Sequence, residues 1–334
     1  MKAITVRKPK SFVLEERPVP QPARGEVRIK VHACGVCHSD KLVRDALWPG
    51  VQLPRVPGHE VAGVIDAVGE GVARFRKGDR VGLGWHGGHD GTCDACLAGH
   101  FVHCRAGKIT GITFDGGYGE YVIAQEVAVA PMPDGIDFAD AAPLLCAGVT
   151  TFNALRNAGA RSGDLVAVQG LGGLGHLGVQ YARAMGFEVV AISRGADKEE
   201  FARKLGAHHY VDSARSGFAG ALTELGGARV ILATAPDAAS MSAAIPGLRI
   251  DGCLLVVGAP FEPFQVSALD LIGRNARIQG WASGSAADSE DAMAFAVRHG
   301  VRPMIERFPH ADAPRAFDAM MAGTVRFRAV IDVA

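Results

Sequence analysis

Cysteine and histidine side chains at three separate points of the 334-residue chain are suited to hold a metal ion. Cys37, His59 and Cys146 each lie in a turn flanked by glycine, and Glu60 follows His59 directly. Thiolate sulfur and imidazole nitrogen are preferred zinc ligands, and a site with three protein ligands keeps a fourth position open for substrate. By itself, the His–Glu pair could equally be an acid/base pair or a hydrogen-bonded turn. The three stretches together favour a catalytic zinc site.

A second group of cysteines lies in the glycine-rich loop formed by residues 87–107. Cys93 and Cys96 have CxxC spacing, and Cys104 follows them. This pattern is typical of a structural zinc site, with free surface thiols as the alternative. The chain has seven cysteines, an odd number. In a chain that begins without a signal-like segment, such spacing favours metal ligands in a reducing compartment over disulfides, so we expect a cytoplasmic protein.

Residues 170–175 have the GxGxxG spacing of a dinucleotide-binding turn. They follow the apolar strand expected at 164–169 and open a helix expected at 176–185. The glycines permit a tight turn, close approach of a pyrophosphate and close packing of helix on strand. The helix N-terminus supplies free N–H groups and a positive dipole. The residues expected to contact the dinucleotide are Gly170, Gly172, Gly173, Leu174 and Gly175.

The strand expected at 188–192 ends without the acidic residue that NAD-binding proteins place on the adenosine ribose. Ser193 and Arg194 follow it, and Lys198 comes shortly after. Because a guanidinium pairs well with a 2′-phosphate, the sequence favours NADP over NAD. The alternative is that Arg194 stacks on the adenine or faces solvent.

The charge balance and the hydropathy of the chain give no indication of a nucleic-acid or membrane partner. The chain has 35 basic and 35 acidic residues, a net charge of zero, which gives no argument for nucleic acid or an anionic membrane surface. No stretch of the sequence approaches the roughly 18 apolar residues of a membrane span. We therefore expect no nucleic-acid or membrane partner.

The elements that must position these residues change in kind near Phe138. Before it, short strands with glycine-rich turns predict a β-rich, barrel-like domain. These strands are expected at 2–6, 26–33, 58–68, 79–83 and 119–124. After helices at 139–145 and 149–158, strands alternate with helices, which predicts a parallel, doubly wound sheet. Its strands are expected at 164–169, 188–192, 230–233, 254–258 and 277–281, with one more around Val211 and a further helix at 198–205.

The tail is expected to return to the first domain, through a helix at 288–299 and a strand at 330–333. The predicted domains are therefore 1–147 with 285–334, which carries the metal sites, and 148–284, which binds the dinucleotide.

Together these motifs resemble the zinc-dependent alcohol dehydrogenases of the medium-chain dehydrogenase/reductase superfamily, over almost the whole chain. Residues 58–69 are similar to the family's zinc signature GHE-x2-G-x5-G, and residues 34–40 to its CGxCH[ST]D block. The resemblance implies an α/β protein with a GroES-like catalytic domain, a Rossmann domain and an active site between them.

The resemblance also implies roles for individual residues. Cys37, His59 and Cys146 would bind the catalytic zinc, and Glu60 would be a neighbour that transiently replaces water on the metal. Ser39 would hydrogen-bond the substrate oxygen, and Asp40 would orient His59. The remaining implied contacts are Thr150 with the nicotinamide, His38 and Arg328 with the pyrophosphate, Val257 with the cofactor, and Trp48 and Trp85 with the substrate, core packing being the alternative for both tryptophans.

The implied activity is that of an oxidoreductase. A primary or secondary alcohol would be oxidised reversibly to an aldehyde or ketone, with zinc as Lewis acid and with hydride passing to NADP or NAD. The family also implies a homodimer or homotetramer paired through the Rossmann sheet edge. Two alternatives remain: a zinc-free quinone or enone reductase on the same fold, and a non-enzymatic scaffold protein. Neither would need the three zinc ligands together.

The chain departs from the family pattern at three positions. The cysteine-rich loop usually carries four cysteines as C-x2-C-x2-C-x7-C, but position 90 is Asp, with His89 beside it. We predict Asp90 as the fourth ligand and His89 as the alternative. The proton relay often ends in a His where this chain has Leu42, and Ser193 replaces the acid of the NAD site.

Overall fold

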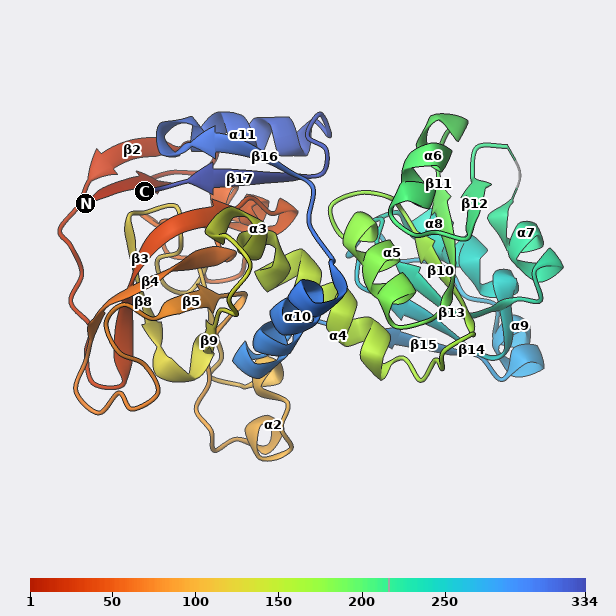
Figure 1. Cartoon of the computed structure of the whole chain (residues 1–334), viewed down its shortest axis with the longest axis horizontal. Coiled ribbons are helices and arrows are strands. Elements are labelled where there is room, and N and C mark those ends of the chain that lie inside the picture. The colour runs from red at the N-terminus through yellow and green to blue at the C-terminus, as the bar shows by residue number, and fades with distance from the viewer. Residues whose placement is uncertain (216) are drawn as a thin grey trace. The chain divides into compact units, whose positions relative to one another are not determined.

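The computed structural model describes residues 1–215 and 217–334 (Figure 1). The chain forms two compact units, Met1–Val149 with Ser283–Ala334, and Thr150–Ala282.

The first unit is built on a seven-stranded sheet whose central strand is β3 (Glu26–Gly35). The strand order is β16-β17-β3-β4-β5-β9, and β8 also pairs with β3. The other strands of this sheet are β4 (Val61–Val68), β5 (Arg80–Leu83), β8 (Tyr121–Gln125), β9 (Val129–Pro131), β16 (Ile305–Pro309) and β17 (Arg328–Asp332). In β3 the side chains of Val27, Ile29 and Val31 are fully buried, as the two-residue period of a half-covered strand requires.

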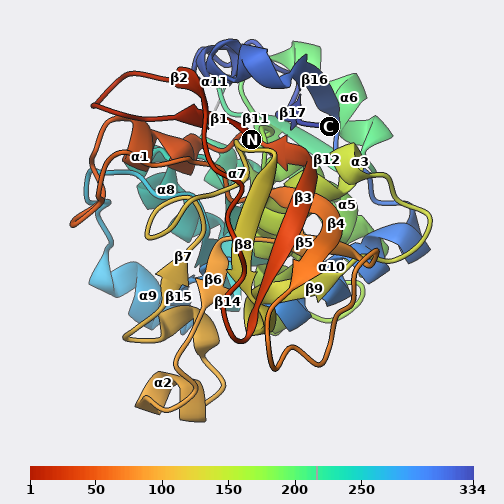
Figure 2. The same ribbon diagram turned by 90° about the vertical axis from the view of Figure 1, so that its left-hand side faces the viewer.

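The rest of the first unit consists of two small ribbons and short helices (Figure 2). The ribbons pair β1 (Lys2–Thr5) with β2 (Val13–Glu16), and β6 (His86–Gly88) with β7 (Lys108–Ile109). The helices are α1 (Lys41–Arg44), α2 (Asp94–Leu97), α3 (Phe138–Pro143), α10 (Ala286–His299) and α11 (Ala313–Met321). The tail strand β17 pairs antiparallel with β3, with Ile331 opposite Cys34, so the C-terminal segment completes this sheet.

One continuous helical run replaces the two helices expected at 139–145 and 149–158. Helix α3 passes into a π-helical stretch, Leu144–Gly148, and then into α4 (Val149–Asn157). This run, Phe138–Asn157, is long and apolar enough to cross a membrane by length and composition alone, with 20 residues and a mean hydropathy of 1.2. However, 83% of its apolar window is buried inside the protein, so these side chains serve as core.

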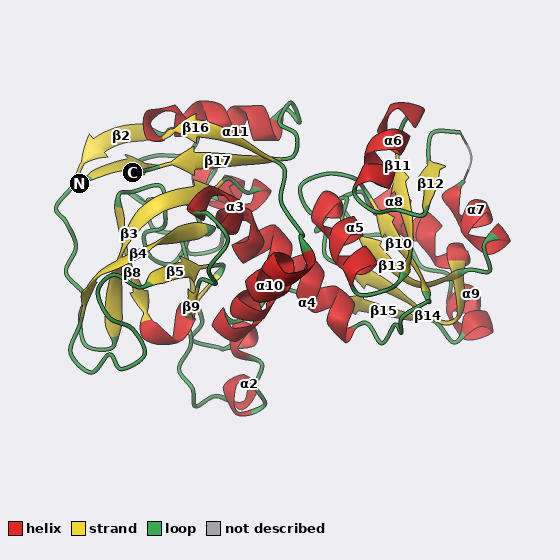
Figure 3. Cartoon of the chain, in the orientation of Figure 1, coloured by secondary structure: helices red, strands yellow, loops and turns green. Residues whose placement is uncertain are grey.

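The second unit contains a six-stranded, wholly parallel sheet in the order β12-β11-β10-β13-β14-β15 (Figure 3). Its strands are β10 (Leu165–Gln169), β11 (Glu188–Ser193), β12 (His209–Asp212), β13 (Ala228–Ala233), β14 (Leu248–Val256) and β15 (Arg277–Gly280). Its further helices are α5 (Gly175–Ala184), α6 (Glu199–Lys204), α7 (Phe218–Glu224), α8 (Ala238–Ala244) and α9 (Ala268–Arg274). The chain order reverses between β10 and β13, which makes the carboxyl ends of these strands the expected ligand crevice. The predicted doubly wound sheet is confirmed.

Candidate active site

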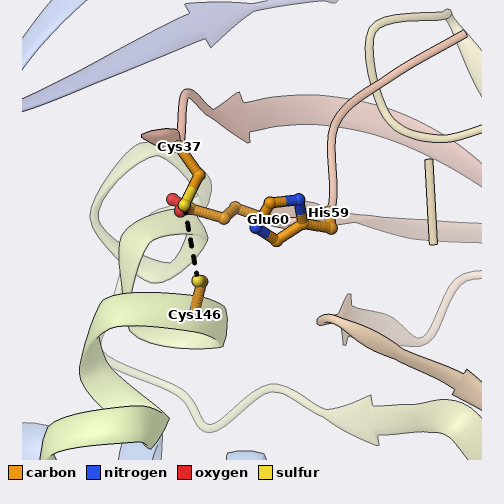
Figure 4. Close-up of side chains that lie close together, drawn as sticks. All are labelled: Cys37, His59, Glu60 and Cys146. Carbon is orange, nitrogen blue, oxygen red and sulfur yellow. Dashed lines mark hydrogen bonds between the residues drawn. The ribbon is translucent and has the colours of Figure 1, made fainter. Parts of the chain in front are cut away.

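Four of the predicted site residues meet at one point of the first unit (Figure 4). The ligand atoms of Cys37, His59, Glu60 and Cys146 all lie within 4.8 Å of one another. Cys37 follows the end of β3, and His59 and Glu60 directly precede β4. The two strands are antiparallel neighbours, with Cys34 opposite Val61, so these ends lie side by side. Cys146 comes from the π-helical stretch.

The geometry of this cluster fits a zinc ion. The sulfur atoms of Cys37 and Cys146 are 3.8 Å apart. Two thiolates bound to one zinc at about 2.3 Å with a tetrahedral angle would be separated by about 3.8 Å. Nε2 of His59 is buried and has no hydrogen-bond partner among the described residues. A buried imidazole nitrogen left in this way is costly unless a metal takes it.

The ionisable groups of the cluster shift one another's pKa values. The hydrogen bond with Cys146 holds the pKa of Cys37 well below the ordinary thiol value, with His59 contributing, and raises the pKa of Cys146. Burial lowers the pKa of His59, but the Cys37 thiolate and the Asp40 carboxylate outweigh it and leave that pKa raised. The cluster thus favours the thiolate form of Cys37, which is the form that binds metal, and disfavours that of Cys146.

Asp40 and Arg328 support the cluster from two sides. Nδ1 of His59 lies 3.3 Å from Oδ1 of Asp40, which directs Nε2 towards the thiols. The resemblance implies a pyrophosphate contact for Arg328, but in the structure its guanidinium forms a buried ion pair with Glu60. Burial raises the pKa of Glu60 to about 7, although Arg328 opposes the shift.

The predicted substrate-pocket residues lie beside this cluster. The ring of Trp85 is 5.0 Å from that of His59, and the ring of Trp48 is 5.9 Å from that of Trp85. Leu42 packs in the same apolar group. Ser39 is half-buried, and His38 is exposed. The wall next to His59 is therefore aromatic and aliphatic.

The second predicted group is brought together as well. The ligand atoms of Asp90, Cys93, Cys96 and Cys104 lie within 4.8 Å of one another, and the sulfurs of Cys93 and Cys104 are 3.8 Å apart. The backbone N–H groups of Thr92 and Cys93 donate to Oδ1 of Asp90 and hold its pKa below the usual value.

The alternative ligand, His89, lies in a different environment. Its Nδ1 is 3.1 Å from Nε2 of His86, and its ring stacks on Phe101 with 4.4 Å between centroids. The structure thus groups the carboxylate of Asp90, and not the imidazole of His89, with the three thiols.

The loop between β10 and α5 has the shape of a phosphate-binding turn. A side chain on Gly175 would collide with the carbonyl oxygen of Gly170, whereas a Cβ on Gly172 would have no atom within 4 Å. Helix and strand therefore pack closely while the outer side of the loop stays open. Thr234, at the end of β13, donates to the Gly170 carbonyl at 3.0 Å. Thr234 is not among the residues predicted from sequence, although a polar residue following the neighbouring strand is a usable signal.

The end of β11 gathers mixed charges. The side chain of Ser193 accepts a hydrogen bond from Nζ of Lys198 at 3.4 Å. The Arg194 side chain is 81% exposed and lies 3.9 Å from a carboxylate oxygen of Asp237. Asp237 is not among the residues predicted from sequence, because it follows a different strand, β13. Of the other predicted cofactor contacts, Thr150 is buried at the start of α4 and Val257 follows β14.

A thiolate–imidazole cluster on a β-rich unit, and a glycine-rich turn on a doubly wound sheet, together define a metal-binding, dinucleotide-dependent dehydrogenase. Residues 23–134 match the alcohol dehydrogenase GroES-like domain, and residues 173–298 match the zinc-binding dehydrogenase family. The chain is 50% identical over 320 residues to the alcohol dehydrogenase patD of Penicillium expansum, covering 96% of this chain and 94% of that protein.

Solved structures agree. A cinnamyl alcohol dehydrogenase of Sorghum bicolor superposes with a TM-score of 0.90 at 32% identity, over 99% of this chain and 97% of that one. The protein CAD of Helicobacter pylori, in complex with NADP(H), gives a TM-score of 0.88 at 28% identity, over 99% of this chain and 97% of that one. The chain belongs to the zinc-dependent alcohol dehydrogenases of the medium-chain dehydrogenase/reductase superfamily. The predicted fold class and alcohol dehydrogenase activity are confirmed, which disfavours the quinone reductase and scaffold alternatives.

We predict that Asp90→Ala weakens zinc binding in the 90–104 loop, because a carboxylate oxygen is a competent fourth zinc ligand. Native mass spectrometry of the parent should find two zinc ions per chain. After mild chelation the variant should retain one, with Cys93 and Cys96 open to alkylation.

His89→Ala is the matched control and should keep both ions. Loss of the loop zinc in His89→Ala but not in Asp90→Ala would show that the imidazole is the ligand.

Proposed function

We propose that Cys37, His59 and Cys146 hold the catalytic zinc of this alcohol dehydrogenase, with Glu60 at its side. The observation that carries the proposal is the buried, partnerless Nε2 of His59 in the same cluster as two thiols 3.8 Å apart. Zinc would supply a Lewis acid for the substrate oxygen, and a bound nicotinamide would exchange hydride with the substrate carbon.

The remaining steps fall to side chains of this chain. Ser39, half-buried two residues after Cys37, accepts the hydroxyl proton of the alcohol and passes it outward. Leu42 is aliphatic and cannot carry that proton further, so the proton leaves Ser39 by a route that does not use this side chain. Asp40 keeps the His59 ring in place, and Arg328 balances the charge of Glu60.

The substrate is an alcohol or aldehyde with an apolar, flat body. Trp48, Trp85 and Leu42 form an apolar wall next to His59, and aromatic side chains favour offset or edge contacts with aromatic rings. Small primary alcohols and aromatic alcohols fit this surface. The relation to a cinnamyl alcohol dehydrogenase of Sorghum bicolor supports the aromatic class.

NADP is the proposed cofactor. Arg194 offers an exposed guanidinium, and the turn after β11 brings the ammonium group of Lys198 back to Ser193, so two cations adjoin the strand end. Asp237 competes for Arg194, but at 3.9 Å the pair is loose and exposed, and such pairs contribute little. The NADP(H) complex of the Helicobacter pylori relative supports the assignment.

A homodimer paired through the sheet edge is the proposed assembly, with a homotetramer as a further possibility. Strand β15 is the edge of the parallel sheet. On the preceding helix α9, Leu269 and Ile272 are 81% and 78% exposed. Exposed apolar groups beside an open strand edge mark an interaction surface.

A reducing compartment such as the cytoplasm is the proposed location. The seven cysteines of the described chain are all free thiols, the state that zinc ligands require.

His59→Ala and Cys37→Ala should each reduce the zinc content by one ion and abolish nearly all turnover, while the second unit still binds cofactor. Ser39→Ala should keep both zinc ions and lower kcat by about 10²- to 10⁴-fold, because it removes a proton acceptor only. Zinc analysis, cofactor fluorescence and steady-state kinetics measure the three quantities. Near-normal turnover in metal-stripped His59→Ala would refute the assignment.

Arg194→Ala should weaken NADP more than NAD, and Ser193→Asp should shift preference towards NAD by repulsion of the 2′-phosphate. A charge-assisted pair contributes roughly 1.5–3 kcal/mol, which predicts an approximately tenfold to hundredfold preference for NADP in the parent. The measurement is kcat/KM with each cofactor. A parent enzyme that prefers NAD would contradict a phosphate contact of Arg194.

Leu269→Glu should split the assembly, because a charge buried in an apolar interface without a partner is costly. Size-exclusion chromatography with light scattering reports the mass. Leu225→Glu, at a surface leucine outside α9, is the control and should leave the mass unchanged. If the parent is oligomeric and Leu269→Glu has the same mass, the interface does not include helix α9.

A further inference from the structure

The carboxylate of Asp40 is held by three groups at once. The hydroxyl of Tyr118 donates to Oδ2 at 3.0 Å, and the backbone N–H of Cys37 donates to the same oxygen at 2.9 Å. Oδ1 faces Nδ1 of His59 at 3.3 Å. Asp40 and Tyr118 are both buried, so water cannot replace any of these contacts. One carboxylate therefore links Tyr118 to two of the proposed zinc ligands.

Tyr118 itself is fixed on all sides. Its backbone N–H donates to the carbonyl of Pro57 at 3.0 Å, and its own carbonyl accepts from the N–H of Ile4 at 2.8 Å. Nε2 of His310 lies 2.9 Å from the same carbonyl. The backbone of Tyr118 is thus held by three segments: strand β1, the chain just before His59 and the C-terminal segment.

The ring of Tyr118 occupies the space that a side chain at position 58 would need. A Cβ on Gly58 would collide with the Tyr118 ring, and Gly58 also has a φ of +98°. The Tyr118 ring therefore packs directly against the backbone of Gly58, the residue that precedes His59. The chain turn carrying the imidazole and the phenol carrying the hydroxyl are packed as one unit.

We propose that Tyr118 is a positioning residue of the metal centre, acting through Asp40 on His59 and Cys37; this rests on the zinc site proposed above. A phenol hydroxyl is protonated at neutral pH and donates a charge-assisted hydrogen bond to the carboxylate. Without it, Oδ2 of Asp40 keeps only the Cys37 N–H and the carboxylate gains freedom to rotate. The orientation of the His59 ring, and hence of Nε2, is then less sharply defined.

The test is Tyr118→Phe, which keeps the ring and removes only the hydroxyl. Zinc release to a colorimetric chelator is followed together with loss of activity, and the phase that parallels activity reports the catalytic site. Loss of a hydrogen-bond partner behind a metal ligand typically weakens binding by about 10- to 100-fold, so we expect release about tenfold faster. The thiolate-to-cobalt absorption of the cobalt-substituted protein should also shift.

Tyr121→Phe is the matched control, since that ring lies beside the Arg28 guanidinium at 5.5 Å. It should release zinc at the parental rate. The hydroxyl also contributes to stability, because it hydrogen-bonds a buried carboxylate. Release rates are therefore compared at temperatures equally far below the unfolding midpoint of each metal-stripped protein, and faster release that persists there is not predicted by a purely structural role.

A double-mutant cycle tests the route through Asp40. In an Asp40→Asn background, Tyr118→Phe should cause little further change, because coupled residues are not additive. If Tyr118→Phe does not fold, His310→Ala loosens the Tyr118 carbonyl without touching Asp40 or a ligand and should speed release to a smaller extent.

Parental zinc release in Tyr118→Phe, or an undiminished effect in the Asp40→Asn background, would overturn the positioning role while leaving the zinc site intact. A parent protein that binds no zinc through Cys37 and His59 would overturn both proposals.

Discussion

The antiparallel pairing of β3 with β4 is the constraint on which the site depends. It sets the end of β3, which leads to Cys37, beside the start of β4, which follows His59 and Glu60. Because side chains alternate along a strand, a slip of one residue would send the buried Val27, Ile29 and Val31 of β3 to the opposite face. The hydrophobic core thus fixes the register, and the register fixes the distance between thiol and imidazole.

The third ligand is positioned by the same sheet. Gly82 of β5 pairs with Ala62 of β4, and a side chain on Gly82 would collide with Leu145. The π-helical stretch therefore lies directly on the sheet, and Cys146 follows Leu145 into the cluster. π-Helical turns are rare and often mark functional sites. Here the irregular turn occurs where a helix must present a thiol to a strand end.

The tail supplies the charge that the buried site needs. Burying Glu60 without a counter-charge would be costly, and Arg328 at the start of β17 provides one. Pairing of β17 with β3, with Val330 opposite Gly35, brings that guanidinium into place. The C-terminal segment is thus part of the site, although it is far away in sequence.

The predictions that succeeded depend on local spacing. The strand–loop–helix pattern at 164–185 and the alternation of strands with helices identified the parallel sheet, because neighbours in sequence are neighbours in these units. The partners of Arg328 and Arg194, and the Tyr118 partner of Asp40, come from distant segments, so no window of sequence contains them. β16, α7, α8, α9 and α11 went unassigned, because their short apolar patterns acquire meaning only through the elements they cover. The roles of the site residues stay predictions.

The two metal clusters differ in what holds them. Ligands of the catalytic cluster come from three separated segments of a packed core and lie together because the sheet places them there. Ligands of the second cluster all come from one loop, in which α2 is a single turn and Leu97 is 76% exposed. Because this loop buries little apolar surface, the proposed zinc would supply much of its folding free energy. In the proposed zinc-bound protein, the first cluster would thus be preorganised by the core before zinc binds, whereas the loop would take its fold from the metal.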